Sequence, residues 1–387
     1  MALTQSLVEK GSLIIDESTF VGTGDKVYIQ GHYYSDKPVM PALLAAIAYA
    51  PLHAMGLKLD YGWNLSYYLI ILMTMKLFWI FSILAFRQAL QFTSVKPSQV
   101  PALTVIYGLT SLAFTWSSTF NNHSLAGSSL MIALYFYLKA KDTASNTFLL
   151  WSGLMFGMAA AMDIPTAVFL VGFGSLVILN NASKMAVMSF TAGSIVPLSI
   201  HLAVNYAIGG TFLPLQIKPE FFQFEGSAWS TPEALSGTTM NPLSFALPYA
   251  FWSLFGVKGF IWYNPLLLLI LPVMYRRLRS GVRFQQETLI ILAGTLILMT
   301  YYFLYSSNYG GWSYSIRWFI PPLSLMMFYL FDLGDWFLES GKRYALGGLL
   351  IISVVIASIG IINPWSNQDL HPIPIIANLL QLFGFLT

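Results

Sequence analysis

Long apolar runs recur along the chain, separated by short polar or basic segments. Runs of about 20 apolar residues are long enough to cross the hydrocarbon core of a bilayer as helices. The pattern predicts ten membrane-spanning helices, at 67–86, 101–120, 124–138, 147–162, 164–181, 186–208, 259–275, 286–306, 316–338 and 344–362. Two of these runs are short, and 147–181 could instead form one long helix kinked at Pro165.

Three further apolar stretches, 41–57, 242–257 and 372–386, are expected to lie along the membrane interface. The expected fold class is an all-α polytopic membrane protein with about ten transmembrane helices plus interfacial helices. Because no internal repeat or low-complexity linker divides the chain, residues 1–387 are expected to form one domain. The parts outside the membrane would be a loop at 1–64 containing the helix 41–57, a loop at 209–258 and a C-terminal segment at 363–387.

Composition supports the membrane assignment and narrows the chemistry. Hydrophobic residues make up 56% of the chain and charged residues 9%, whereas about a quarter of an ordinary soluble domain is charged. There is no cysteine, which excludes disulfides, thiolate metal sites and a cysteine nucleophile. The net charge of +3 is too small to indicate a nucleic-acid partner, and residues 1–20 lack the basic start and apolar core of a signal peptide.

Basic residues indicate the orientation of the chain. With the N-terminus outside, the predicted inner loops hold most of the Lys and Arg residues, including a cluster at 276–283, as the positive-inside rule requires. The same topology brings polar residues from separate parts of the chain to the outer side. Polar groups at membrane depth are costly and tend to face a cavity or a partner, so a polar site is expected at the outer surface.

Each candidate residue in that site also has a purely structural explanation. Lys37 in "GHYYSDKPVMP" (31–41) could extend to lipid headgroups, or its ammonium could bind a phosphate carried on a lipid. Arg317 could anchor the chain at the interface or grip an anion with its guanidinium. Asp163 could cap the helix that starts at Pro165. His123 could belong to a polar turn or act as a base or ligand.

Other chemistries find little support. The sequence contains no Walker loop, no GxSxG elbow and no HExxH motif, and its five histidines show no spacing that places two on one helical face. No metal site is therefore expected. A transporter would need broken helices that face each other at mid-membrane or an inverted repeat, and only the break at 162–165 fits that pattern.

The stretch "DKVYIQGHYYSDKPVMPALLAAIAYAPLHAMGL" resembles the first outer loop of GT-C membrane glycosyltransferases. That group includes the lipid A aminoarabinose transferase and the protein O-mannosyltransferases. The matching features are a glycine turn, an aromatic pair, an acidic residue and Lys-Pro before an interfacial helix. They correspond here to Gly31, Tyr33, Tyr34, Asp36, Lys37 and Pro38. "FNNHSLAG" (120–127) and the stretches 201–214, 256–270 and 310–323 are similar to further parts of bacterial members.

The resemblance implies a GT-C fold in a bacterial inner membrane, with the site on the outer face. It implies a polyprenyl-phosphate sugar as donor substrate, no certain cofactor, and an open question about a divalent metal. The donor phosphate is expected to contact Lys37, with Arg317 and Tyr34 beside it. The residues expected to line the cavity are Tyr33, Asn122, His123 and Trp312.

In these relatives an acidic catalytic motif stands at the outer end of a first helix, and this chain begins just after the corresponding position. Asp25, Asp36 and Asp163 are therefore the candidates for a catalytic base. The leading hypothesis is an inverting glycosyltransferase that moves a sugar from a polyprenyl-phosphate donor to an acceptor. The alternative is a non-catalytic GT-C-like subunit that binds lipid or pigment within a larger membrane complex. Expected partners are membrane lipids, the donor and, under the alternative, other membrane subunits.

The predicted orientation can be tested by cysteine labelling, because the chain has no cysteine of its own. A cysteine at Ser236 should react with a membrane-impermeant thiol reagent on intact cells, and a cysteine at Ser280 should react only after the membrane is permeabilised. Labelling at position 280 without labelling at 236 on intact cells would reverse the orientation.

Overall fold

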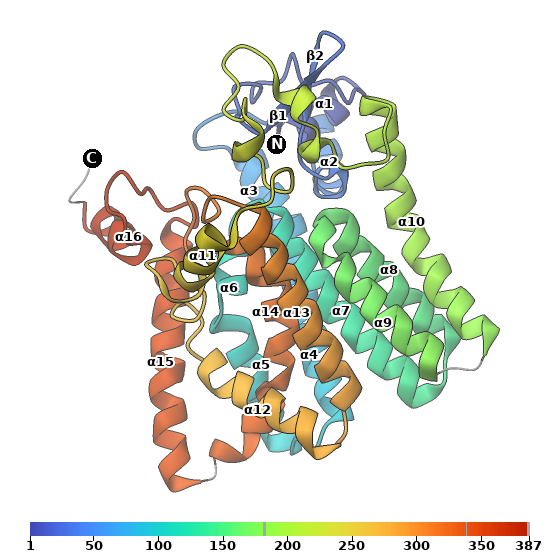
Figure 1. Ribbon diagram of the computed structural model, residues 1–387, viewed down its shortest axis with the longest axis vertical. Coiled ribbons are helices and arrows are strands. Elements are labelled where there is room, and N and C mark those ends of the chain that lie inside the picture. Colours follow the sequence, from blue (N-terminus) through green and yellow to red (C-terminus); the bar gives the residue numbers. More distant parts are fainter. Residues whose placement is uncertain (181–182, 338, 385–387) are drawn as a thin grey trace.

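The computed structural model describes residues 1–180, 183–337 and 339–384. Helices dominate this part of the chain, and its strands form one two-stranded hairpin (Figure 1). The longer elements are α1 Ala2–Glu9, β1 Lys26–Ile29, β2 His32–Ser35, α2 Val39–Ala54, α3 Leu65–Ile71, α4 Leu77–Ala89, α5 Val100–Leu109, α6 Leu112–Trp116, α7 Asn122–Thr143, α8 Asn146–Met162, α9 Ala167–Asn180, α10 Lys184–Gly209, α11 Leu243–Phe255, α12 Leu267–Ser280, α13 Gln285–Tyr305, α14 Ile320–Met326, α15 Ser340–Ile362 and α16 Pro374–Leu382.

Four helices are long and apolar enough to cross a membrane, which agrees with an integral membrane protein. They are Leu65–Phe92, Lys184–Gly209, Gln285–Tyr305 and Gly341–Ile362. The first of them joins α3 to α4 through a π-helical turn at Leu72–Lys76. Other expected spans are present as helices that are shorter or less apolar, such as α7, α8 and α9. The number of ten transmembrane helices is therefore not established by the structure.

The stretch 147–181 is a hairpin and not one kinked helix. α8 ends at Met162, Asp163 adopts an extended conformation, and α9 begins at Ala167 after a short 3-10 turn. α7, α8 and α9 lie side by side, and α10 runs along the same face (Figure 1). The reversal at Asp163–Thr166 brings the end of α8 next to the start of α7, where Asn122 Nδ2 donates to the carbonyl of Met162 at 3.2 Å.

Three expected spans are interrupted. The run 101–120 is divided into α5 and α6 by an extended Ser111, and the Leu112 amide donates to Asn264 Oδ1 at 3.0 Å instead of to its own helix. In 259–275, turns precede α12, which begins only at Leu267. In 316–338, a 3-10 turn at Arg317–Phe319 leads into α14 and then a 3-10 segment at Met327–Phe337, while residue 338 lies outside the described residues.

The N-terminal segment contains a β-hairpin that the all-α expectation did not include. β1 and β2 are antiparallel, with Val27 opposite Tyr34 and Tyr28 opposite Tyr33. β1 is anchored by a small apolar cluster in which Val27 and Ile29 pack with Leu215, Phe222 and Leu235 from the segment after α10. The hairpin, α1, α2 and this later segment therefore gather at one end, the upper end in Figure 1.

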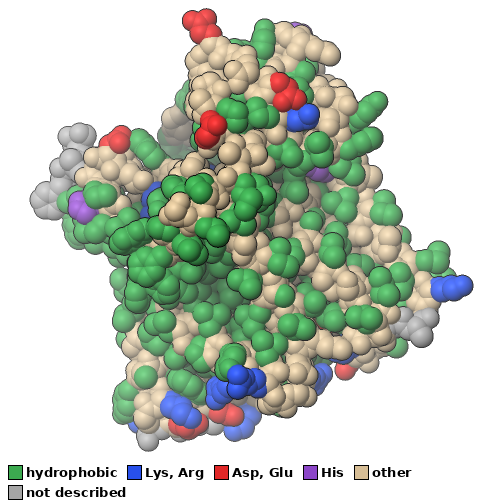
Figure 2. Space-filling view, in the orientation of Figure 1, with side chains coloured by type: hydrophobic (Ala, Val, Ile, Leu, Met, Phe, Trp, Pro, Cys, Tyr) green, Lys and Arg blue, Asp and Glu red, His purple; other side chains and the backbone are tan. Residues whose placement is uncertain are grey.

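Helices occupy the three stretches that were expected to lie along the membrane interface, and their position relative to a membrane stays a prediction. They are α2 for 41–57, α11 for 242–257 and α16 for 372–386, although residues 385–387 lie outside the described chain. Hydrophobic and uncharged side chains cover most of the middle of the molecule, and Lys and Arg gather at the lower end (Figure 2). The helix ends that lie there include the C-terminal ends of α7 and α12 and the N-terminal end of α15 (Figure 1). The basic loops thus share one end, opposite the hairpin.

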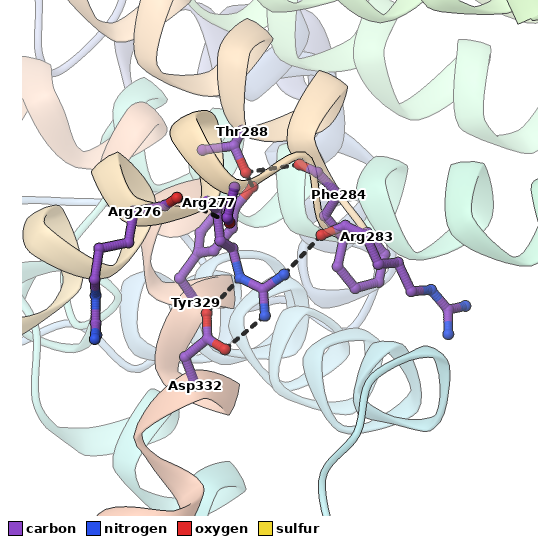
Figure 3. Close-up of polar contacts among 8 residues, drawn as sticks. Arg276, Arg277, Arg283, Phe284, Thr288, Tyr329 and Asp332 are labelled. Carbon is purple, nitrogen blue, oxygen red and sulfur yellow. Dashed lines mark hydrogen bonds and ion pairs between the residues drawn. The ribbon is translucent and has the colours of Figure 1, made fainter.

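An ion pair organises the lower end (Figure 3). The Arg277 guanidinium, near the end of α12, binds both carboxylate oxygens of Asp332 and also donates to the carbonyl of Arg283 at 2.6 Å. The Thr288 hydroxyl in the first turn of α13 bonds Tyr329, which lies one turn before Asp332. These contacts connect α12, α13 and the 3-10 segment. Side chains therefore hold together the segments in which the regular α-helix is interrupted.

Helices α8 and α10 cross closely because each places a glycine against the backbone of the other. A Cβ atom at Gly153 would lie 2.0 Å from the carbonyl oxygen of Phe190, and one at Gly193 would lie 2.1 Å from that of Leu150. Small residues allow helix backbones to approach within a membrane.

The substitution Gly193→Ala should therefore force α8 and α10 apart and destabilise the protein by about 1–3 kcal/mol. The matched control is Gly347→Ala in α15, where an added Cβ meets nothing within 4 Å. The control should be neutral or stabilising by about 0.5–1 kcal/mol. Thermal unfolding in detergent measures both, and equal melting temperatures for the two variants would contradict the close packing.

Candidate functional site

A cavity of about 730 Å³ opens at the upper end, where separate parts of the chain meet. Its wall is formed by the start of α2, the start of α7, the turn between α8 and α9, the side of α13, the segment 214–237 and the turn before α14. Eight residues expected from the sequence lie on it: Asp25, Asp36, Lys37, Asn122, His123, Asp163, Trp312 and Arg317. Of these, Trp312 is about half exposed.

Lys37 is held between two carboxylates. Its Nζ lies 3.0 Å from Asp25 Oδ1 and 3.0 Å from Asp36 Oδ2. Asp36 is buried, whereas the Lys37 and Asp25 side chains are 48% and 50% exposed. The position follows from the local sequence, since a residue before proline stays extended and Pro38 is the N-cap of α2. Lys37 is thus fixed between the end of β2 and the start of a helix.

Asp25, Asp36 and Lys37 form a charged triplet before the first membrane-spanning helix. Within it, the pKa values of the two carboxyls shift in opposite directions. Burial raises the pKa of Asp36 to about 6, although Lys37 opposes the shift. Burial also acts to raise the pKa of Asp25, but Lys37 and then Arg317 outweigh it, so the pKa of Asp25 is lowered. For Lys37, burial acts to lower the pKa and the two carboxylates outweigh it, so the pKa is raised. Lys37 stays charged, and Asp25 is the more acidic partner.

His123 and Asp163 form a second polar pair. The Nδ1 atom of His123 lies 2.8 Å from Asp163 Oδ2, and both residues are buried, with exposures of 6% and 3%. Asn121 caps α7 by accepting from the Ser124 amide at 2.8 Å, which places His123 in the first turn. The Asp163 side chain binds the imidazole and makes no capping bond to the following turn. Its carbonyl accepts from Thr166 instead.

Arg317 forms no ion pair with any described residue. Its guanidinium lies over the rings of Trp365 and Trp116, with its carbon 4.6 and 5.6 Å from their centroids. The Nη1 atom is buried and has no hydrogen-bond partner within the described chain. A charged group that has lost water and gained only aromatic faces still needs an acceptor, so an anion in the cavity would complete its coordination.

The aromatic pair of the hairpin lies elsewhere. Tyr33 packs on Tyr28 and Phe224, with Lys26 Nζ 4.4 Å from its ring centre. Tyr34 points to the other side, against the cluster around Val27. Neither tyrosine lines the cavity, in contrast to the expectation that Tyr33 would line it and Tyr34 would bind the phosphate. Successive side chains of a strand point to opposite faces, and both faces here are occupied by packing.

Several wall residues were not identified from the sequence. Trp365, Trp318, Tyr301 and Tyr302 line the cavity, but aromatic residues in such a chain are explained equally well as anchors at the membrane interface. Trp365 follows α15, and its Nε1 donates to Thr119 at 3.1 Å. The Arg317 guanidinium lies over its ring, and this contact, which the sequence pattern does not predict, shows that Trp365 belongs to the site.

No family model matches this chain, and no curated protein sequence matches it significantly. Solved structures do match. ArnT from Cupriavidus metallidurans in the apo state superposes with a TM-score of 0.53 at 13% identity, over 99% of this chain and 64% of ArnT. ArnT from the same organism bound to undecaprenyl phosphate gives 0.51 at 12% identity, over 99% and 70%. The apo oligosaccharyltransferase of Archaeoglobus fulgidus gives 0.48 at 10% identity, over 97% and 51%.

The ArnT likeness shows the fold, and the GT-C fold implied by the sequence resemblance is confirmed. This chain spans about two thirds of the ArnT chains.

Protonation of Asp36 provides a test of the triplet. Below pH about 6 a carboxylic-acid C=O band should appear in infrared difference spectra, and it should be lost as the pH rises. The substitution Asp36→Asn should remove the band. Because Lys37 lowers the pKa of Asp36 and Asp25 raises it, Lys37→Met should move the midpoint to higher pH and Asp25→Asn to lower pH. A midpoint that stays in place in both variants would show that the three groups do not interact.

Proposed function

We propose that this protein binds a polyprenyl-phosphate sugar in the upper cavity and transfers the sugar to an acceptor at the outer membrane face, with inversion at the sugar C1. The observation that carries the proposal is the Arg317 guanidinium. It faces a cavity, lies on two tryptophan rings and lacks a carboxylate partner within the described chain. A guanidinium can bind phosphate oxygens bidentately.

Lys37 supplies the second positive charge, on a different element of the same wall. It is shared by Asp25 and Asp36 in the structure, so most of its charge is already balanced. Arg317 is therefore the main phosphate ligand, and Lys37 adds to it as charge develops on the departing phosphate. Positive groups arranged in advance around a leaving phosphate stabilise the transition state.

The rest of the cavity suits a lipid-linked donor and a second substrate. Ile297 and Leu298 on α13 and Ile217 provide apolar wall beside the charged groups. The segment 234–237 covers the cavity from the side of the loop 209–258 and would lie next to the acceptor. A solved ArnT structure contains undecaprenyl phosphate, which makes that lipid the first probe for this chain.

The candidate bases differ in availability. Asp25 and Asp36 are both engaged by Lys37, and the Asp36 carboxyl is raised in pKa and enclosed. Asp163 is engaged by His123 and has a side chain that is only 4% exposed. General-base catalysis requires contact with the acceptor proton. Of the three carboxylates, only the Asp25 side chain has a substantial exposed surface.

Undecaprenyl phosphate binding tests the proposal. Arg317→Gln should weaken binding by about 10- to 150-fold, the equivalent of the ~1.5–3 kcal/mol of a charged hydrogen bond. Lys37→Met should weaken it less, because the lysine charge is shared. Arg317→Lys keeps the charge without the planar fork and should recover only part of the affinity. Native mass spectrometry of the detergent-solubilised protein measures the bound lipid.

Arg343→Gln is the matched control, because Arg343 is an exposed arginine at the start of α15. Equal affinities for the Arg317→Gln and Arg343→Gln variants would end the proposal. Specific binding through Arg317 without turnover of any undecaprenyl-phosphate sugar would support the non-catalytic alternative instead.

A further inference from the structure

The pair His123–Asp163 is the only histidine–carboxylate pair on the cavity wall among the described residues. Three features hold it in place. Asn121 caps α7 directly before it, Asn122 ties that turn to the end of α8, and the imidazole and carboxylate meet at 2.8 Å. Burying two such groups is costly unless each satisfies the other. The hairpin of α8 and α9 exposes this pair to the cavity instead of to hydrocarbon.

The hydrogen bond to Asp163 determines what the imidazole can do. A neutral imidazole that donates from Nδ1 to a carboxylate carries its lone pair on Nε2. Among the described residues, Nε2 of His123 has no hydrogen-bond partner, and it is not one of the enclosed polar atoms. The cavity is therefore the direction from which Nε2 can accept a proton.

The carboxylate next to it completes the arrangement. When Nε2 takes up a proton the imidazole becomes positively charged, and the Asp163 carboxylate, buried beside it, stabilises that charge. Asp25 and Asp36 lack this property, because each accepts from Lys37, which carries a positive charge already. Protonation of either would weaken an existing ion pair.

We propose that His123, oriented by Asp163, is the proton acceptor of the transfer reaction and that the acceptor substrate reacts through a hydroxyl group. The inference rests on the proposed function and deepens it. The hydroxyl oxygen forms the new bond to the sugar C1, and its proton passes to Nε2 of His123. The bond from C1 to the phosphate oxygen breaks, and its electron pair leaves with the polyprenyl phosphate held by Arg317 and Lys37.

A hydroxyl is the acceptor class that this arrangement favours. A neutral hydroxyl is a weak nucleophile until its proton is removed, so a base in contact with it contributes about 10²- to 10⁴-fold to the rate. Azide ion attacks C1 without a proton to lose. It therefore separates the role of a base from every other role of the same residue.

The experiment uses the full chain in lipid nanodiscs with a panel of undecaprenyl-phosphate monosaccharides, with water and methanol as hydroxyl acceptors and azide as the acceptor without a proton. The main variant is His123→Asn, whose amide replaces Nδ1 and keeps a donor toward Asp163 while removing Nε2. It should lower transfer to water and methanol by about 10²- to 10⁴-fold and leave formation of the glycosyl azide unchanged. Asp163→Asn should show the same selectivity with a smaller loss.

His201→Gln is the control, because His201 is as buried as His123 and bonds a side chain, Asn205, but does not line the cavity. It should leave both reactions unchanged. Undecaprenyl phosphate binding by each variant shows that the fold and the phosphate site are intact.

Equal loss of hydroxyl and azide transfer in His123→Asn would show a structural role and overturn the inference, as would no loss in either reaction. If the wild-type protein transfers sugar and His123→Asn retains hydroxyl transfer, the inference fails while the proposed function stands. If the wild-type protein neither binds undecaprenyl phosphate nor turns over any donor, the proposed function fails and the inference falls with it.

Discussion

Polar groups that are left unpaired away from water cost free energy, and the irregular passages of this fold are arranged so that they pair with one another. At the break before α6, the side chain of Asn264 satisfies the backbone: it accepts from the Leu112 amide and donates to the carbonyl of Phe260. The turn before α14 is tied to the same region, since Ser315 donates to the carbonyl of Lys258 at 2.8 Å. Three distant segments thus become one connected structure at the upper end of the bundle.

That connection positions the residues of the cavity. Trp116, at the end of α6, donates to the carbonyl of Tyr314 at 3.2 Å, and its ring lies beneath Arg317. Lys258 donates to the carbonyl of Gly311 at 2.6 Å, which holds the turn that precedes Arg317. Burial, followed by the charge of Arg317, lowers the pKa of Lys258 to about 8. These hydrogen bonds hold the backbone that precedes Arg317, and none of them neutralises the guanidinium.

The charged groups of the cavity differ in how far they are compensated. Lys37 is balanced by two carboxylates, and Asp163 is hydrogen-bonded to an imidazole. The Arg317 guanidinium lies against aromatic rings and forms no ion pair within the described chain. Opposite charges that already form an ion pair contribute little attraction for a third partner, whereas a partly buried cation without an ion-pair partner, such as Arg317, contributes more. This difference is the reason that the proposed anion site is assigned to Arg317 and the proposed proton acceptor to the His123–Asp163 pair, both of which line the cavity.

The sequence by itself determined the long apolar helices around 65–92, 184–209 and 285–305, the basic loops at one end and the candidates Lys37, His123, Asp163 and Arg317. Those features follow from the local cost of placing each segment in hydrocarbon. Only the tertiary structure decided that 101–120 is broken, that Tyr33 and Tyr34 pack away from the cavity and that Trp365 lies on Arg317. These outcomes depend on hydrogen bonds and ring contacts between residues far apart in the chain, such as Leu112 with Asn264, and local periodicity carries no information about such partners.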